Sequence, residues 1–137
     1  MAERFKAAVD GGARGNPGPA AWGVAVLDAD GDYVEGHNGL LGRATNNVAE
    51  YAALIEALKI AEARGAREVD IQSDSELIVR QILGAYRVKH PDLKPLYQRA
   101  KEIIARFESF RIRHVRRNEN KHADGLVNAA LDGDESA

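Results

Sequence analysis

The stretch that most constrains the fold runs from residue 7 to residue 19 and reads Ala7-Ala8-Val9-Asp10-Gly11-Gly12-Ala13-Arg14-Gly15-Asn16-Pro17-Gly18-Pro19. It begins as an apolar strand, places Asp10 at the end of that strand, and then turns through four glycines and two prolines. A second strand resumes at 22–26. Glycines let another backbone come close, so this pattern is typical of a chain that offers an acid to a charged ligand. The alternative is a plain loop between two hairpin strands with one solvated aspartate.

Three strands are predicted in the first third of the chain, at Phe5–Asp10, Trp22–Leu27 and Tyr33–Leu41. Turn residues separate them, first in the glycine-rich stretch and then in the polar segment 28–32. Because both connections are short, we expect these strands to form an antiparallel meander.

A long helix is predicted to begin near Thr45, which is a good N-cap residue, and to end at Gly65. Its apolar stripe follows the helical spacing i, i+3, i+4, i+7 through Tyr51, Leu54, Ile55 and Leu58. The segment Glu68–Gln72 alternates apolar and polar residues and reads as a strand. A strand that follows a long helix is expected to lie parallel to the earlier strand, through a right-handed crossover.

The remaining predicted elements are a short helix over 77–82, an irregular segment at 84–95, a helix whose apolar stripe runs over 93–107, a strand at 110–115 and a last helix over 123–131. The predicted fold class is α/β, a mixed five-stranded sheet in the order β-β-β-α-β-α-α-β-α with helices on its faces. We expect one domain over 1–131, followed by a short, frayed polar tail at 132–137.

Composition excludes several classes of protein. The chain has 137 residues, the size of one domain, and it has no cysteine, which excludes disulfides and cysteine-based zinc sites. The first six residues lack the apolar segment of a signal peptide, and no apolar run approaches the ~20 residues of a membrane span. We therefore expect a soluble, cytoplasmic protein without a membrane partner, and a monomer by default.

The net charge and the distribution of charge point to different conclusions about binding to nucleic acids. The net charge of −2 argues mildly against a nucleic-acid binder. Basic side chains nevertheless gather within twelve residues, at Arg111, Arg113, His114, Arg116, Arg117, Lys121 and His122. Such a run is either a solvated face or a surface for an acidic partner, and the sequence pattern leaves both interpretations open.

Four of the acidic residues differ from the others in their setting. Asp10 ends an apolar strand, and Asp74 follows the strand 69–72, so parallel strands would bring both to one sheet edge. Glu50 flanks the buried stripe of the first helix, and Asp124 borders the stripe of the last helix. Carboxylates pushed together against a core repel one another unless a cation lies between them. Oxygen-only ligands suit two Mg²⁺ ions, with Mn²⁺ as the alternative.

With these residues in view, the chain resembles type 1 ribonuclease H. The matching pieces occur in the order of the family and span most of the chain: Val9-Asp10-Gly11-Gly12, Gly15-Asn16-Pro17-Gly18-Pro19, Thr45-Asn46-Asn47-Val48-Ala49-Glu50, Ser73-Asp74-Ser75 and Asn120-Lys121-His122-Ala123-Asp124. Integrases and resolvases share the acids but not, as a rule, the glycine loop or the Thr-Asn-Asn start of the helix. The resemblance implies a ribonuclease H-like fold and an endonuclease that cuts the RNA strand of an RNA–DNA hybrid, leaving 5′-phosphate and 3′-hydroxyl ends.

The resemblance also implies roles for the acids. Asp10 would bridge two divalent metal ions, Glu50 and Asp74 would hold the ion on the leaving-group side, and Asp124 would hold the ion that activates water. Glu50 would also lie close to a 2′-hydroxyl of the RNA.

Contacts with the substrate are implied in the same way. Amide groups of Asn16, Asn46 and Asn47, with the backbone of Gly11 and Gly12, would read 2′-hydroxyls through the minor groove. Thr45 matches a phosphate contact on the DNA strand.

Two departures from the family pattern bear on the substrate. Many members carry a basic protrusion where this chain has only the short, lightly basic segment 84–95, so we expect a weaker grip on the DNA strand. Many also carry a histidine before the last acid, whereas this chain has Arg116-Arg117-Asn118-Glu119-Asn120, and His122 lies in the helix start. Arg117 is our candidate for the substitute, as in compact archaeal-type members, with Arg116 as the alternative. The other interpretation is that both arginines simply bind phosphate. Both departures leave cleavage of double-stranded RNA open.

Three other functions compete with this interpretation. A non-catalytic module that binds hybrid or RNA on the same fold would need one of the four acids to be lost, and none is. A DNA-directed nuclease would have no use for contacts with 2′-hydroxyls. A phosphate-binding regulatory domain built on the glycine loop would need that loop to end in Gly-Lys-Ser/Thr and to lead into a helix, whereas here the ending is absent and a strand follows.

Overall fold

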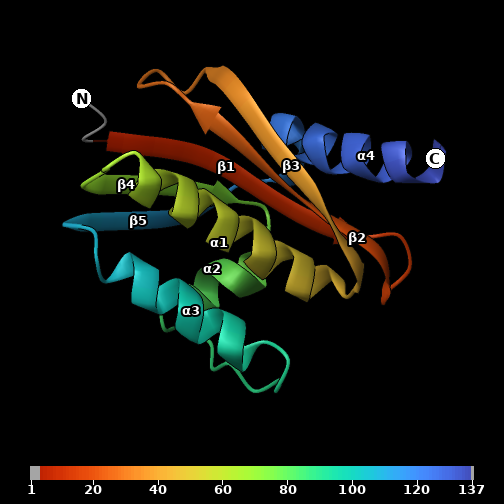
Figure 1. The fold of residues 1–137 in the computed structure, drawn as a ribbon. Coiled ribbons are helices and arrows are strands. Elements are labelled where there is room, and N and C mark those ends of the chain that lie inside the picture. Colours follow the sequence, from red (N-terminus) through yellow and green to blue (C-terminus); the bar gives the residue numbers. More distant parts are fainter. Residues whose placement is uncertain (1–3, 137) are drawn as a thin grey trace.

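The computed structural model describes residues 4–136 and contains one five-stranded sheet with helices on both faces (Figure 1). The elements follow one another as β1 (Arg4–Ala13), β2 (Gly18–Leu27), β3 (Tyr33–Ala44), α1 (Asn46–Ala63), β4 (Glu68–Ser73), α2 (Glu76–Ile82), α3 (Lys94–Ile104), β5 (Ser109–His114), a 3₁₀ turn (Arg117–Glu119) and α4 (Lys121–Ser136). The predicted order of strands and α-helices is confirmed, and the 3₁₀ turn is an addition.

The first hairpin is longer than its sequence pattern predicts. Strand β1 continues past Asp10 because Gly11, Gly12 and Ala13 still pair with β2, and the Arg14 N–H closes the turn on the carbonyl of Pro19 at 2.8 Å. Only residues 14–17 are left to make the turn. The prediction that Asp10 ends its strand is therefore wrong, since Asp10 lies inside β1.

The sheet order is β3-β2-β1-β4-β5, with β1 antiparallel to β2 and parallel to β4. The predicted meander and the predicted parallel pairing are both confirmed. In the parallel pair, Val9 lies opposite Ser73. The next residues, Asp10 and Asp74, therefore leave neighbouring strands side by side.

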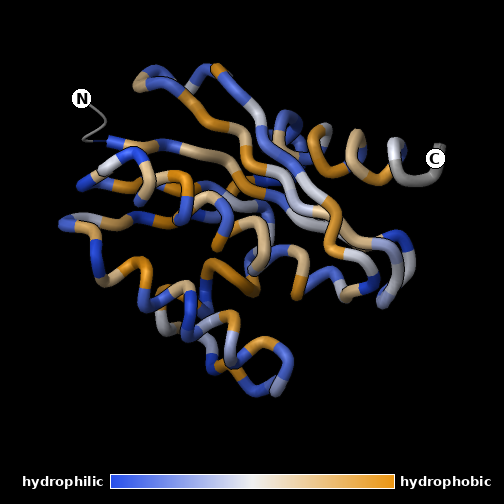
Figure 2. Tube along the Cα trace, viewed as in Figure 1, coloured by the Kyte–Doolittle hydropathy of each residue, from blue (hydrophilic) through white to orange (hydrophobic). Residues whose placement is uncertain are grey.

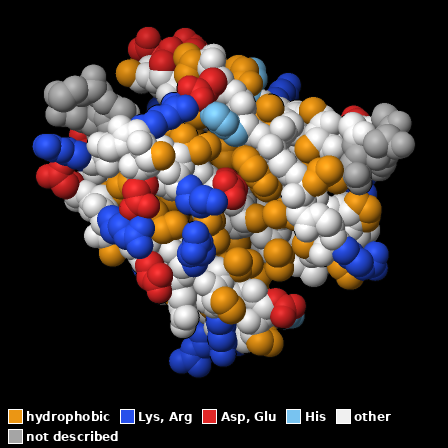
Figure 3. Space-filling view, in the orientation of Figure 1, with side chains coloured by type: hydrophobic (Ala, Val, Ile, Leu, Met, Phe, Trp, Pro, Cys, Tyr) orange, Lys and Arg blue, Asp and Glu red, His pale blue; other side chains and the backbone are white. Residues whose placement is uncertain are grey.

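Helices α1, α2 and α3 cover one face of the sheet, and α4 packs on the other face against β1, β2 and β3 (Figure 1). The larger core lies on the α1 side, where the large side chains of Tyr51, Leu54 and Leu58 are fully buried. Figure 2 shows apolar and polar segments alternating along the helices, as expected for elements with one face on the sheet. On the face drawn in Figure 3, basic and acidic side chains are interspersed over α1 and α3.

The helix ends follow the predicted local chemistry at α1 but not at α4. Thr45 caps α1 by accepting a hydrogen bond from the N–H of Val48 at 3.2 Å, and Gly65, with φ of +71°, ends it. Helix α4 continues to Ser136, so most of the segment predicted as a frayed tail continues the helix. Within residues 4–136, no helix has the length and apolar character needed to cross a membrane.

Replacement by alanine should affect the two adjacent glycines, Gly11 and Gly12, very differently. A Cβ on Gly11 would lie 2.1 Å from the carbonyl oxygen of Ala49 in α1, whereas a Cβ on Gly12 would meet only the Val127 side chain at 3.8 Å. Because a backbone contact of 2.1 Å forces α1 away from β1, we expect Gly11→Ala to lower the free energy of unfolding by about 1–3 kcal/mol or more. Denaturant unfolding measures this difference.

Gly12→Ala is the matched control, and we expect it to change the free energy of unfolding by less than about 0.5 kcal/mol. Equal stability of the two variants would contradict the close packing of α1 on β1.

Candidate active site

Three carboxylates from three elements meet at one end of the paired strands. Asp10 comes from β1, Glu50 from the second turn of α1, and Asp74 from the residue after β4, and ligand oxygens of all three lie within 4.8 Å of one another. Asp10 is buried, and the other two are half-buried. They line a cleft of about 530 Å³ that also includes Asp124.

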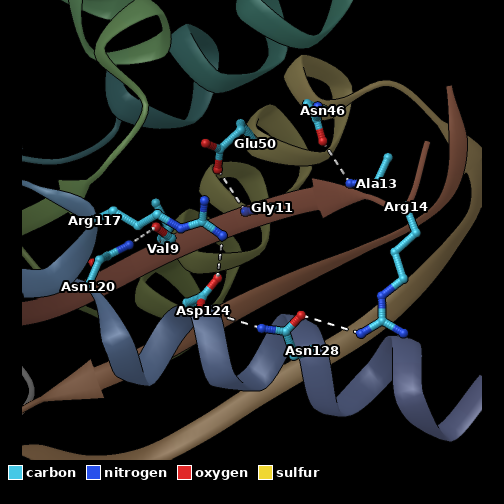
Figure 4. Close-up of polar contacts among 10 residues, drawn as sticks. All are labelled: Val9, Gly11, Ala13, Arg14, Asn46, Glu50, Arg117, Asn120, Asp124 and Asn128. Atoms are coloured by element: carbon cyan, nitrogen blue, oxygen red, sulfur yellow. Dashed lines mark hydrogen bonds and ion pairs between the residues drawn. The ribbon is translucent and has the colours of Figure 1, made fainter. Parts of the chain in front are cut away.

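Glu50 is held in this group by the backbone of β1. The Gly11 N–H donates to Oε1 of Glu50 at 2.7 Å (Figure 4), which is a short bond from backbone to carboxylate. The missing side chain of Gly11 permits this approach, because the backbone of α1 occupies the space of a Cβ. The predicted close approach at the glycine stretch is therefore confirmed at Gly11.

Asp124 reaches the cleft from the opposite layer. It lies in the first turn of α4, outside the group of three, and its Oδ1 is 3.7 Å from a guanidinium nitrogen of Arg117 (Figure 4). It is close enough to Asp10 to raise the pKa of that carboxyl through its charge and a hydrogen bond. All four predicted acids thus line one cleft, three of them tightly grouped.

Burial and mutual repulsion leave these acids poorly stabilised as anions. Burial first, and then the charges of Asp74 and Asp124, raise the pKa of Asp10 to about 8. Burial, followed by the charges of Asp10 and Asp74, also raises the pKa of Glu50 well above its ordinary value, although the Gly11 hydrogen bond opposes this. Burial raises the pKa of Asp74, against a hydrogen bond with Asp10 and the charge of Arg117. A bound divalent cation would relieve the repulsion, and oxygen ligands suit Mg²⁺ or Mn²⁺.

A second acidic group provides a contrast. Asp28, Asp30 and Asp32 also bring ligand oxygens within 4.8 Å of one another, but none of the three is buried. Oδ1 of Asp28 accepts from the N–H groups of the other two at 2.9 Å, which is the ordinary hydrogen bonding of a turn. Only the first group combines proximity with burial.

Comparison with known proteins identifies the family. Residues 8–130 match the protein family described as reverse transcriptase-like. The chain is 44% identical over 129 residues to Ribonuclease HI of Halobacterium salinarum, which covers 94% of this chain and 65% of that protein. It superposes on the crystal structure of RNase H1 from that archaeon with a TM-score of 0.90, covering 95% of this chain and 98% of the other. The chain belongs to the type 1 ribonuclease H family.

Two further relatives are a longer mycobacterial protein and a ribonuclease H solved with an RNA/DNA hybrid. It is 46% identical over 124 residues to Bifunctional protein Rv2228c of Mycobacterium tuberculosis, spanning 90% of this chain but only 34% of that protein. The N-terminal RNase H domain of Rv2228c superposes with a TM-score of 0.90 at 42% identity, covering 98% of this chain and 99% of the other. LC11-RNase H1 in complex with an RNA/DNA hybrid superposes with a TM-score of 0.88 at 42% identity, covering 94% and 97%.

The chain therefore spans about two thirds of one curated relative and a third of the other. The predicted ribonuclease H-like fold is confirmed by the superpositions, which cover nearly the whole chain.

The asparagines that the ribonuclease H resemblance assigns to the substrate also join the first hairpin to α1. Oδ1 of Asn16 accepts from the N–H of Asn46 at 3.0 Å. Figure 4 shows the second bond, in which Oδ1 of Asn46 accepts from the N–H of Ala13 at 2.8 Å. Their amide nitrogens donate no hydrogen bond to residues 4–136, so the donor ends remain available. Asn47 is exposed beside them.

The two candidate arginines differ in position. Arg117 lines the cleft, and its side chain is 82% exposed, whereas Arg116 is not among the residues that line it. The N–H of Arg116 instead donates to Oε1 of Glu119 at 3.0 Å within the 3₁₀ turn. The ring of His122 stacks on Tyr33 with 4.6 Å between ring centroids.

Sequence reasoning missed Asn120 as an individual site residue. Its side chain is 1% exposed, its Nδ2 donates to the carbonyl of Val9 at 2.9 Å, and its backbone carbonyl accepts from the N–H of Asp124 at 3.1 Å. It therefore connects the strand of Asp10 with the helix of Asp124. Its Oδ1 is buried with no hydrogen-bond partner in the described part of the chain. The only signal in the sequence was its place in the matched motif.

The raised carboxyl pKa values predict how stability changes with pH in the presence of a chelator. The fold raises the pKa of Asp10 from its ordinary value of 3.8 to about 8, so between these pH values the folded state retains a proton that the unfolded state has lost. The free energy of unfolding should therefore fall as pH rises from about 4 to about 8, by up to about 1.4 kcal/mol per pH unit for each retained proton. Denaturant unfolding at each pH measures it.

Asp10→Asn is the control for that series, because it removes the group whose pKa is raised to about 8. Its stability should depend less on pH across the same window. Stability that rises with pH across this window in the original chain would contradict the assigned repulsion.

Proposed function

We propose that this chain is an endoribonuclease that hydrolyses the RNA strand of RNA–DNA hybrids with two divalent metal ions, leaving 5′-phosphate and 3′-hydroxyl ends. One observation carries the proposal: three buried or half-buried carboxylates from separate elements meet within 4.8 Å in a cleft that a fourth carboxylate also lines. The relative LC11-RNase H1, whose structure includes an RNA/DNA hybrid, supports the choice of substrate.

The four acids are the residues that would hold the metal ions. Asp10 would contribute to both ions, as the resemblance to ribonuclease H implies, and its carboxyl lies close enough to Asp74 and Asp124 to interact with each of them. We assign Glu50 and Asp74 to one ion and Asp124 to the other. A pair of divalent ions supplies positive charge to the attacking and leaving oxygens of a phosphodiester displacement. Mg²⁺ is the proposed metal, and Mn²⁺ is the alternative.

Recognition of the RNA strand is assigned to Asn46, which lines the cleft, and to Asn16, whose side chain accepts a hydrogen bond from the Asn46 N–H. Because the amide oxygens of Asn16 and Asn46 accept backbone hydrogen bonds, their orientation is fixed and their N–H donors face away from those bonds. Such donors suit the 2′-hydroxyls in a minor groove, which separate RNA from DNA. We assign Asn47 and the backbone of Gly12 to the same surface, and Thr45 to a phosphate of the DNA strand.

In this proposal Gly11 orients a metal ligand, whereas the resemblance implies that its backbone contacts the substrate. Its N–H donates to Glu50 at 2.7 Å, so it orients a carboxylate and is already occupied as a donor. We assign Arg117 to a phosphate of the substrate, since its exposed guanidinium lies in the same cleft as the acids. The cytoplasmic location and the monomeric state expected from the sequence stay predictions.

The test is cleavage of a labelled RNA–DNA hybrid beside double-stranded RNA and double-stranded DNA, with Mg²⁺, with Mn²⁺ and with chelator. We expect metal-dependent cutting of the RNA strand of the hybrid. Asp10→Asn should lower the rate by at least about 100-fold, because loss of a metal ligand costs more than the 10–100-fold typical of residues behind a ligand. Cutting of double-stranded RNA as well would show that specificity is relaxed.

Two arginine variants complete the same assay. Arg117→Ala should weaken hybrid binding evenly across sequences and reduce its salt dependence, whereas Arg116→Ala should leave the salt dependence closer to that of the original chain. An intact chain that binds hybrid but cuts none of it with either metal would overturn the proposal. That result would favour the non-catalytic binding module.

A further inference from the structure

A chain of polar contacts joins the first hairpin to the acid of α4. Nδ2 of Asn128 donates to Oδ2 of Asp124 at 3.4 Å, and Oδ1 of Asn128 accepts from the guanidinium of Arg14 at 3.4 Å (Figure 4). The same guanidinium nitrogen donates to Oδ1 of Asp132 at 2.7 Å. Asp124, Asn128 and Asp132 are four residues apart along α4, so they share the face of the helix that meets the hairpin.

This series of polar contacts ends at Asp124, the acid that lies outside the group of three carboxylates. Asp124 comes from the opposite layer of the fold, and its two oxygens have different partners. Oδ1 lies 3.7 Å from Arg117, whose side chain is 82% exposed, and Oδ2 accepts from Asn128. An exposed arginine at that distance orients a carboxylate weakly. The Asn128 amide is therefore the hydrogen-bond donor on the other side of Asp124, which also interacts with Asp10.

The amide of Asn128 is itself restrained. Each of its two bonds is long and weak alone, but its oxygen faces a guanidinium that the 2.7 Å bond to Asp132 holds against α4. Arg14 is in turn fixed to the hairpin, since its N–H closes the turn on Pro19. With a cation facing its oxygen, the Asn128 amide is kept with its N–H group towards Asp124. Arg14 and Asn128 both line the cleft of the four acids.

We propose that Asn128 is a positioning residue that orients the Asp124 carboxylate, that Arg14 holds Asn128 in place, and that together they set the affinity of the cleft for divalent cations. This inference rests on the proposed function, because it assigns the residues that act through one of its metal ligands. Nothing in the ribonuclease H resemblance singled out Asn128 or Arg14.

The experiment is a calorimetric titration of Mn²⁺, and separately of Mg²⁺, into the whole chain and its variants without substrate. Asn128→Ala should weaken binding about tenfold, as is typical when the residue behind a metal ligand is removed. Asn128 is exposed and alanine favours helix, so the melting temperature in chelator should stay within about 2 °C. Arg14→Gln should weaken binding by a smaller factor, because it removes the anchor and not the donor.

Gln98→Ala is the matched control, since it removes an exposed amide from α3, far from the cleft in sequence and absent from its lining. It should bind metal as the original chain does. Metal affinity of Asn128→Ala equal to that of Gln98→Ala would overturn the positioning role.

A double-mutant cycle separates action through Asp124 from a general effect. Asp124→Asn removes the ligand, so adding Asn128→Ala to it should change the remaining metal affinity by less than about twofold. A full tenfold loss in that background would show that Asn128 does not act through Asp124 and would overturn the inference. If the original chain binds metal and cleaves hybrid while the cycle is additive, only the positioning role fails. If the original chain binds no metal, the proposed function fails with it.

Discussion

Three consecutive residues of β1 hold the candidate active site together. The carbonyl of Val9 accepts from the buried Asn120, which begins the helix of Asp124, and the N–H of Gly11 donates to Glu50 of α1. Val9 also pairs with the last residue of β4, which places Asp74 alongside. Asp10 therefore lies between neighbours that each fix another acid. Helices α1 and α4 both pack on β1, from opposite faces of the sheet, so the acids of both layers meet at this strand.

The geometry that brings the acids together also makes them costly to ionise. Burial and like charges raise the pKa values of Asp10, Glu50 and Asp74, so the fold stores repulsion that favours either protons or a cation. A well-packed core adjoins the site. Within it, the hydroxyl of Tyr51 in α1 donates a hydrogen bond to Oε1 of Gln81 in α2 at 2.7 Å. Such a core can maintain an arrangement that local interactions alone would not favour. The departure from ordinary charge placement is therefore concentrated where chemistry is proposed.

Much of the fold was predictable because its signals are local. The cap at Thr45, the glycine after α1 and the apolar stripe of α1 lie within a few residues of one another, and the parallel strands brought Asp10 beside Asp74. The extent of β1 was not predictable from its glycines, because pairing with β2 decides where the strand ends. The last turns of α4 were missed because polar composition there outweighed helical spacing.

The contacts of the supporting residues could not be predicted from their local sequence. Asn120 bonds to a residue 111 positions away, and Arg14 bonds to Asn128 and Asp132 at separations of 114 and 118. Such pairs become visible only when the two layers of the fold are assembled. The acids, in contrast, were predictable from their flanking apolar residues and from the resemblance to ribonuclease H.

The most direct measurement is the number of protons released when Mg²⁺ or Mn²⁺ binds, obtained by calorimetry at pH 7 in two buffers of different ionisation enthalpy. Because metal ions bind carboxylates and not carboxylic acids, raised pKa values predict a net release of protons at pH 7 that becomes smaller towards pH 9. Metal binding without proton release at pH 7 would contradict the account of a buried, mutually repelling carboxylate site. An absence of metal binding would contradict the site itself.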